Sequence, residues 1–225
     1  MSETKDISST FNEKGYVAIP GFLPGGLARL VYDYTNIRFA NGDLEVIDDG
    51  FVPMALTKYG DYFCESLLIH YLPVMKQLTG KDLAPTYSYL RRYKEGDNLP
   101  KHQDRYSCEY SITACAGYDY DGNDFQWPIY MNREKFVQEP GDAIMYKGCE
   151  YKHWRDQLPW GHQVQIHLHY IDKESPWYPE LELDTRFRLG QGQHQRNNDV
   201  IDKWLQQSKT DGKGYREKNP LTGES

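Results

Sequence analysis

The hydrophobic pattern changes its period at residue 85, and this change constrains the fold more than any other feature of the chain. From Pro85 on, large side chains recur at every second position, at Tyr87, Tyr89, Arg91 and Tyr93, which is typical of a β-strand. Further short strands are predicted between turn residues, at 110–116, 127–131, 143–146 and 163–171. The second half of the chain is therefore expected to form an antiparallel sandwich of short strands.

The region before residue 85 has a different character. Residues 15–23 read as one strand that ends at a Pro-Gly turn. Apolar residues then recur at helical spacing over 26–38 and, more strongly, over 63–78. The whole chain is thus predicted to be mainly β with N-terminal helices, built on a double-stranded β-helix, the jelly-roll or cupin-like core.

A chain of 225 residues with 39% hydrophobic content is long enough to form one domain with a sizeable core. We expect a lead-in, a single domain that contains helices and a jelly roll, and a polar tail with one short helix. In order, these segments are 1–13, 14–175 (helices within 24–80, jelly roll at about 85–172) and 176–225 (helix at 200–207).

Charge and cysteine content restrict the class of protein. The net charge of −7 argues against a nucleic-acid backbone or an anionic membrane as the main partner. The chain contains no apolar run long enough to span a bilayer, and its first residues lack a signal-peptide core. Four cysteines without C-x-x-C spacing predict reduced thiols in a cytoplasmic protein. The oligomeric state stays open.

His102 and Asp104, with His153 further along the chain, are the candidate metal ligands. Side chains two residues apart on a strand point the same way, so His102 and Asp104 are expected to share a face. A second histidine from a neighbouring strand completes a 2-His-1-carboxylate set, which suits Fe(II) and leaves coordination positions open. The competing interpretation is a solvated surface pair, because the H-x-D pattern alone is common.

Three segments around these residues resemble the Fe(II)/2-oxoglutarate-dependent dioxygenases, and most closely their prolyl-hydroxylase-like branch. The segments are 15–23 (GYVAIPGFL), 89–96 (YLRRYKEG, followed by the H-x-D) and 140–146 (PGDAIMY). The resemblance covers roughly residues 10–172. It implies that His102, Asp104 and His153 bind Fe(II) and carry catalysis, with 2-oxoglutarate as cosubstrate and O2 as oxidant. The implied reaction hydroxylates an unactivated C–H bond of a peptidyl residue, amino acid or small metabolite and releases succinate and CO2.

Gln163 departs from the family pattern. These enzymes usually carry an arginine about ten residues after the distal histidine, and this arginine pairs with the far carboxylate of 2-oxoglutarate. Gln163 can donate a hydrogen bond but supplies no charge. Arg155 is the first candidate for the missing cation and Lys147 the second, and Tyr93 matches the family tyrosine that binds the cosubstrate. Alternatively, Arg155 forms an ion pair at the rim with a neighbouring acid, Asp156 or Glu150.

The last predicted strand is polar on one face and apolar on the other. Its polar face carries Gln163, Gln165, His167 and His169, and we expect this face to look into the barrel beside the metal while the apolar face packs into the sandwich. A strand with one face in water is the alternative. His167 or His169 could also replace His153 as a metal ligand, although the resemblance favours His153.

The sequence is also compatible with two other functions. A cupin-like metal-dependent enzyme could use the same triad without 2-oxoglutarate, and the glutamine at position 163 keeps this alternative open. A non-catalytic binding module on the same fold is the second alternative. The intact triad argues against it, because degenerate copies usually lose a ligand.

Overall fold

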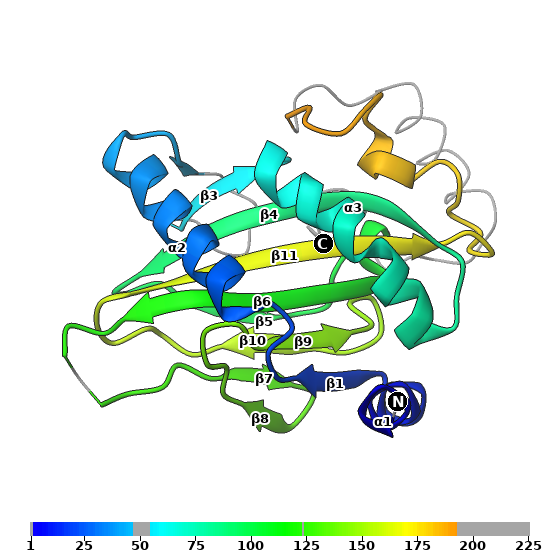
Figure 1. The fold of residues 1–225 in the computed structure, drawn as a ribbon, viewed down its shortest axis with the longest axis horizontal. Helices are drawn as coiled ribbons and strands as arrows, with labels where there is room; N and C mark the ends of the chain where they lie inside the picture. The colour runs from blue at the N-terminus through cyan, green and yellow to red at the C-terminus, as the bar shows by residue number, and fades with distance from the viewer. Residues whose placement is uncertain (1, 47–54, 123, 193–225) are drawn as a thin grey trace.

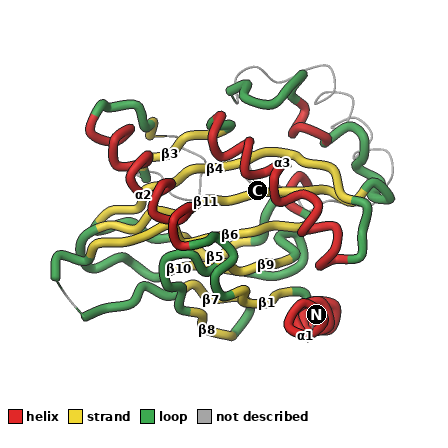
Figure 2. The backbone as a smooth tube through the Cα atoms, viewed as in Figure 1, coloured by secondary structure: helices red, strands yellow, loops and turns green. Residues whose placement is uncertain are grey.

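A computed structural model describes residues 2–46, 55–122 and 124–192 (Figure 1). Its three α-helices, which are red in Figure 2, all precede the long strands of the core in the sequence. They are α1 (Ser2–Lys14), α2 (Gly25–Ala40) and α3 (Tyr62–Thr79), and two short 3-10 helices follow later, η1 (Tyr106–Cys108) and η2 (Glu182–Thr185). Among the described residues, no helix combines the length and apolar character needed to cross a bilayer.

The strands form two antiparallel sheets. The larger sheet has the order β1-β9-β6-β11-β4-β3-β2, and the smaller sheet has the order β5-β10-β7-β8. The large-sheet strands are β1 (Tyr16–Ile19), β2 (Glu45–Val46), β3 (Leu56–Tyr59), β4 (Leu83–Lys94), β6 (Tyr110–Asp119), β9 (Ala143–Tyr146) and β11 (His162–Asp172). The small-sheet strands are β5 (Leu99–His102), β7 (Ile129–Met131), β8 (Glu134–Phe136) and β10 (His153–Arg155).

Helices α2 and α3 lie across one face of the large sheet, over β6, β11 and β4 (Figure 1). Helix α3 begins where the Asp61 side chain accepts hydrogen bonds from the backbone N–H groups of Phe63 (2.9 Å) and Cys64 (3.1 Å). It ends at Gly80, whose φ of 69° lies in the left-handed region that glycine adopts without strain. Clear start and stop residues explain why this helix was predicted almost to its ends.

The main hydrophobic core lies between these helices and the large sheet. Leu90 of β4 and Leu168 of β11 are fully buried in it together with Leu68 of α3, and the Tyr170 hydroxyl donates to the Leu68 carbonyl at 2.9 Å. The expectation that the apolar face of the last strand packs into the sandwich was therefore wrong. That face packs outward against the helices, which leaves the polar face for the interior between the sheets.

The predicted fold, a mainly β jelly roll with N-terminal helices, is confirmed. Strand β9 coincides with the predicted 143–146, and β11 extends the predicted 163–171 by one residue at each end. The residues at 15–23 form a shorter strand, β1. The predicted helix at 200–207 lies outside the described residues.

Candidate metal centre and cosubstrate pocket

The H-x-D histidine and the distal histidine lie side by side in the small sheet. His102 is the last residue of β5 and His153 the first of β10, and the two residues are direct partners in the antiparallel pairing. Asp104 follows after β5 has ended, so the expectation that His102 and Asp104 share one strand was wrong. The Asp104 backbone N–H instead donates to the Gly148 carbonyl at 2.9 Å, which holds the carboxylate beside both rings.

The three side chains converge on one point. The Oδ1 atom of Asp104 lies 3.3 Å from His102 Nε2 and 3.4 Å from His153 Nε2. Two ligand atoms about 2.1 Å from one metal ion are roughly 3.0 Å apart at a right angle and roughly 3.4 Å apart at a tetrahedral angle. The spacing therefore fits a single divalent ion bound by all three residues.

Each ring is oriented by its other nitrogen. His102 Nδ1 lies 2.7 Å from the Pro100 carbonyl oxygen, and His153 Nδ1 lies 3.2 Å from the Tyr151 carbonyl oxygen. A carbonyl can only accept, so Nδ1 carries the proton in both rings and Nε2 keeps its lone pair. Metal-binding histidines are commonly fixed in this way.

The electrostatics favour an ionised carboxylate at Asp104. Burial opposes ionisation of Asp104, but His153 and His102 outweigh it and hold the carboxyl pKa well below its usual value. Burial and the neighbouring His153 lower the pKa of His102. Burial also opposes the charge on His153, but Asp104 raises the pKa of that ring. A divalent ion requires the ionised carboxylate and neutral rings, so its binding would displace the proton that Asp104 favours on His153.

Gly148 packs directly against the Asp104 carboxylate. A Cβ atom at this position would clash with Asp104 Oδ2 and lie 2.6 Å from the Cys108 carbonyl oxygen, so only glycine fits. Asp104 Oδ2 is buried and has no hydrogen-bond partner among the described residues. A buried carboxylate oxygen without a partner is costly, and a bound cation removes the cost. The donor set therefore fits a metal.

Arg155 is buried in the same interior, with 2% of its surface exposed. Its guanidinium donates to the Trp127 carbonyl at 3.0 Å and to Gln138 Oε1 at 2.7 Å, and it lies 4.8 Å from the Trp127 ring centre. No carboxylate of the described residues pairs with it, so the alternative of a rim ion pair with an adjacent acid, Asp156 or Glu150, was wrong. Burial lowers the pKa of this guanidinium. A buried cation without a counter-ion is a ready site for an anion.

Tyr93 and Gln163 lie next to Arg155 and face each other across the β4–β11 pairing. The Tyr93 ring packs edge-on against the Trp127 ring that Arg155 also covers. The Gln163 Oε1 atom accepts from the Tyr120 hydroxyl, which leaves Gln163 Nε2 buried without a partner among the described residues. The Tyr93 hydroxyl is buried without a partner there too. Tyr93 and Tyr120, which is the hydrogen-bond partner of Gln163, both act on the Arg155 charge, so the two spare hydrogen-bonding groups belong to the surroundings of the guanidinium.

Lys147 is placed differently. Its ammonium forms an ion pair with Glu150 at 3.3 Å, and more than half of the Glu150 side chain is exposed. A surface pair of this kind satisfies the lysine without a ligand.

The polar face of β11 is buried, so the alternative of a face in water was wrong. Gln165 is fully buried and donates to Gln138 Oε1 at 3.3 Å, and His169 is 4% exposed with Nδ1 2.8 Å from Ser111 Oγ. His167 Nε2 is buried without a partner among the described residues. Burial lowers the pKa of His169 to about 4 and that of His167 well below its usual value.

Sequence reasoning missed Gln138 and Asp184 near the site. Gln138 accepts from both Arg155 and Gln165 and so positions the guanidinium. Arg105, which directly follows the metal carboxylate, forms a buried ion pair with Asp184. Asp184 also accepts from Ser107 Oγ at 2.6 Å. Asp184 is 79 residues away from its arginine, and no local pattern marks such a pair.

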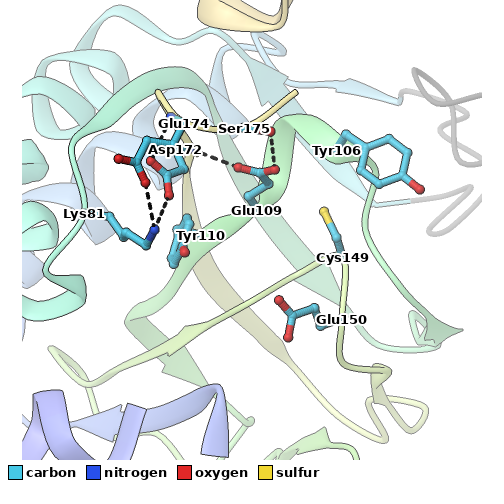
Figure 3. A pocket seen from close by; sticks show the side chains of 9 residues that line it. All are labelled: Lys81, Tyr106, Glu109, Tyr110, Cys149, Glu150, Asp172, Glu174 and Ser175. Atoms are coloured by element: carbon cyan, nitrogen blue, oxygen red, sulfur yellow. Dashed lines mark hydrogen bonds and ion pairs between the residues drawn. The ribbon is translucent and has the colours of Figure 1, made fainter. Parts of the chain in front are cut away.

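A separate cavity of about 470 Å³ opens near Cys149 (Figure 3). Its acidic walls are already paired: Lys81 contacts Asp172 at 2.9 Å and Glu174 at 3.4 Å. Glu109 accepts from Ser175 Oγ at 2.5 Å. This cavity therefore lacks the spare donors and acceptors that distinguish the interior between the sheets.

No protein-family model matches the sequence, and no curated protein matches it. Solved structures do match, with low sequence identity. A prolyl-4-hydroxylase from Pseudomonas putida is 17% identical with a TM-score of 0.58, and the match covers 75% of this chain and 98% of that one. The 2-oxoglutarate-dependent epimerase SnoN from nogalamycin biosynthesis is 12% identical with a TM-score of 0.62, covering 76% and 83%.

A third match is HygX from Streptomyces hygroscopicus, solved with nickel, 2-oxoglutarate and hygromycin B, at 13% identity and a TM-score of 0.56, covering 76% of this chain and 88% of that one. These likenesses agree with the family that the sequence motifs indicated. At such identities they establish the architecture. The chain has the double-stranded β-helix fold found in the 2-oxoglutarate/Fe(II) oxygenase family.

Proposed function

We propose that this protein is an Fe(II)- and 2-oxoglutarate-dependent dioxygenase that hydroxylates an unactivated C–H bond. The observation that carries the proposal is the pairing of two features in one interior. One is the convergent triad of His102, Asp104 and His153, and the other is the buried guanidinium of Arg155, which pairs with no carboxylate in the described part of the chain. A metal site beside an anion site is what a chelating dicarboxylate requires.

The triad residues have defined roles in this proposal. His102 and His153 bind Fe(II) through Nε2, and Asp104 binds it through a carboxylate oxygen. When bound there, the ion would supply O2 activation coupled to the oxidative decarboxylation of 2-oxoglutarate to succinate and CO2, the chemistry that hydroxylation requires. The protein contributes the ligand geometry and a dry interior.

Arg155, Tyr93 and Gln163 would hold the far carboxylate of 2-oxoglutarate. Two of the five N–H donors of Arg155 are used by Trp127 and Gln138, and the others are available to an anion. The Tyr93 hydroxyl and Gln163 Nε2 are the unpartnered neutral groups beside it. Arg155 on β10 thus replaces the charge that position 163 on β11 lacks. We assign the role to Arg155 over Lys147 because Lys147 is paired with Glu150.

The substrate is a small molecule or a peptidyl residue. Solved structures with this fold include one with hygromycin B and a prolyl hydroxylase from Trichoplax adhaerens in complex with a peptide fragment, so the fold accepts both classes. We propose that residues 41–60 and the segment after 176 select between them. The buried Arg105–Asp184 pair supports this role, because it fixes part of that later segment beside the metal carboxylate. The four free thiols support a cytoplasmic location.

Anaerobic titration of the Fe(II)-loaded protein with 2-oxoglutarate tests the proposal. The expected result is a weak visible charge-transfer band that appears and saturates as the keto acid chelates the iron. Bound iron without such a band would contradict it. The result would then favour a cupin-like metal-dependent enzyme that does not use 2-oxoglutarate, which the neutral Gln163 supports.

A further inference from the structure

Asp104, Cys108 and His169 form a second group of metal-ligating side chains beside the triad. One ligand atom from each residue lies within 4.8 Å of the other two. Cys108 is 1% exposed and His169 is 4% exposed. Neither residue has a role in the proposed oxygenase reaction, so their convergence on the metal carboxylate requires its own explanation.

The local backbone brings the thiol back to the carboxylate. Helix η1 turns the chain directly after Asp104, and its closing bond joins the Cys108 N–H to the Arg105 carbonyl at 2.9 Å. His169 arrives from β11, opposite Ser111 of β6. The Ser111 Oγ atom lies 2.8 Å from His169 Nδ1, which leaves Nε2 as the nitrogen available to a metal.

The surroundings of Cys108 and Asp104 also favour metal binding. The Tyr87 hydroxyl lies 3.0 Å from Cys108 Sγ and can donate to the sulfur when it is a thiolate. Asp104 lies 3.3–3.4 Å from both triad histidines through Oδ1, whereas Oδ2 is buried without a partner among the described residues. One sulfur, one imidazole nitrogen and one carboxylate oxygen therefore meet in a buried space.

We propose that Asp104, Cys108 and His169 form a second divalent-cation site that takes a thiophilic ion such as Zn²⁺. A thiolate with an imidazole is a softer donor set than the triad and favours zinc over magnesium, calcium or manganese. Binding releases the thiol proton to solvent, and the thiolate and the carboxylate together balance the charge of the ion. The inference needs only these three residues and holds whether or not the protein is an oxygenase.

Sharing of Asp104 has a consequence. The carboxylate serves both groups, so a thiophilic ion at the second site competes with the triad for this ligand. Zinc at the Cys108 site would therefore weaken iron binding without occupying the iron position.

Titration with Co²⁺ under anaerobic conditions tests the site, with the full chain first treated with a chelator. Cobalt bound to a thiolate gives a near-ultraviolet charge-transfer band, whereas cobalt in the triad has only nitrogen and oxygen ligands and gives none. We expect a band that saturates as cobalt is added and is displaced by Zn²⁺. Absence of the band in the unmodified protein would overturn the proposal.

Three variants assign the band. Cys108→Ser should abolish it, and His169→Gln should weaken cobalt binding at this site at least tenfold. Cys149→Ser is the matched control and should keep the band. Cys149 is a second thiol near the site, and its Sγ donates a hydrogen bond to the Arg105 carbonyl oxygen at 3.2 Å. A band that survives in Cys108→Ser or disappears in Cys149→Ser would overturn the assignment.

X-ray absorption spectroscopy of the zinc-loaded, unmodified protein tests the site without any substitution. Its result therefore does not depend on whether the variants fold. One sulfur neighbour at about 2.3 Å is expected in the zinc coordination shell. A shell that contains only nitrogen and oxygen would overturn the proposal.

Discussion

The two faces of strand β11 are both largely buried and are chemically opposite. Val164, Ile166 and Leu168 face the helices and are fully buried in the main core. Gln163 and Gln165 face the space between the sheets and are 1% and 0% exposed. The difference lies in what each face meets: one meets apolar side chains of α2 and α3, and the other meets Arg155, Gln138 and the metal ligands.

The comparison separates stability from function. An apolar side chain in a core gains free energy from burial, whereas a buried polar atom without a partner costs about 1–3 kcal/mol. Gln163 Nε2 and His167 Nε2 both lack a partner among the described residues. We therefore expect the helix side of β11 to carry the stability of the fold and the interior side to carry ligand binding.

The largest effect is expected for His102→Ala in the interior. This variant removes one of three ligand atoms and should abolish stoichiometric Fe(II) binding, because the two that remain do not hold the ion tightly. Metal analysis after gel filtration measures the effect, and circular dichroism should show an unchanged fold. Retention of one Fe(II) per chain would show that the triad is misassigned.

Leu168→Ala on the helix side should have the opposite result. Loss of a fully buried leucine costs about 2–5 kcal/mol in free energy of unfolding. Denaturant titration measures this loss, and the affinity of the folded variant for 2-oxoglutarate should stay within twofold. A large loss of affinity with little loss of stability would show that the two faces are not independent.

Lowering the pH should reduce the free energy of unfolding through His169, on the interior side of β11. The folded-state pKa of His169 is about 4, below the 6.5 of an unfolded histidine, because burial disfavours the charged ring. The unfolded chain therefore binds more protons between these values, and stability falls as the pH drops from 6.5 towards 4, by roughly 3 kcal/mol for this residue. Denaturant titrations across this range in the presence of a chelator measure the slope. His169→Gln should show a shallower slope, and an identical slope would contradict the assignment.

Arg155→Met should weaken 2-oxoglutarate binding at least tenfold, or about 1.4 kcal/mol, while leaving the free energy of unfolding equal or higher. Methionine fills a similar volume and removes a buried charge that has no acidic partner among the described residues. The charge-transfer titration measures the affinity, and thermal unfolding measures the stability. An unchanged affinity would move the role to Lys147 or Gln163.

Lys147→Ala should have the smallest effect. Its ammonium is already paired with the exposed Glu150, and a surface pair contributes about 0–1 kcal/mol. The affinity for 2-oxoglutarate should change by less than twofold. The free energy of unfolding should change by less than about 1 kcal/mol. A tenfold loss of affinity would reverse the order of the two candidate cations.

The sequence predicted the elements that have a clear local period. The long alternation of β11 and the capped helix α3 were both found close to their observed ends. Strands β2, β3 and β8 were not predicted, because two to four residues are too few to establish an alternation, whereas the equally short β9 was found from the Pro140-Gly141 turn before it. Pairing with β4 extends the large sheet to β3, whereas β2 and β8 are edge strands that pair only with β3 and β7.

The same limit applies to the site. The triad was predicted from spacing and resemblance, and the structure brings its three residues together. The burial of Arg155 followed from its position two residues after His153. The contribution of Gln138 could not be predicted, because it depends on a loop meeting two strands of different sheets.

The orientation of the two ligand histidines has a practical consequence for the identity of the bound metal. Pro100 and Tyr151 fix the rings through bonds made within the chain, two residues away in each case. These bonds fix where the nitrogens point, and nothing in them distinguishes one first-row divalent ion from another. Affinity at such a site rises from manganese through iron, cobalt and nickel to copper. The ion that a preparation contains will therefore reflect the metal supply during expression and purification, and iron must be restored deliberately before activity is measured.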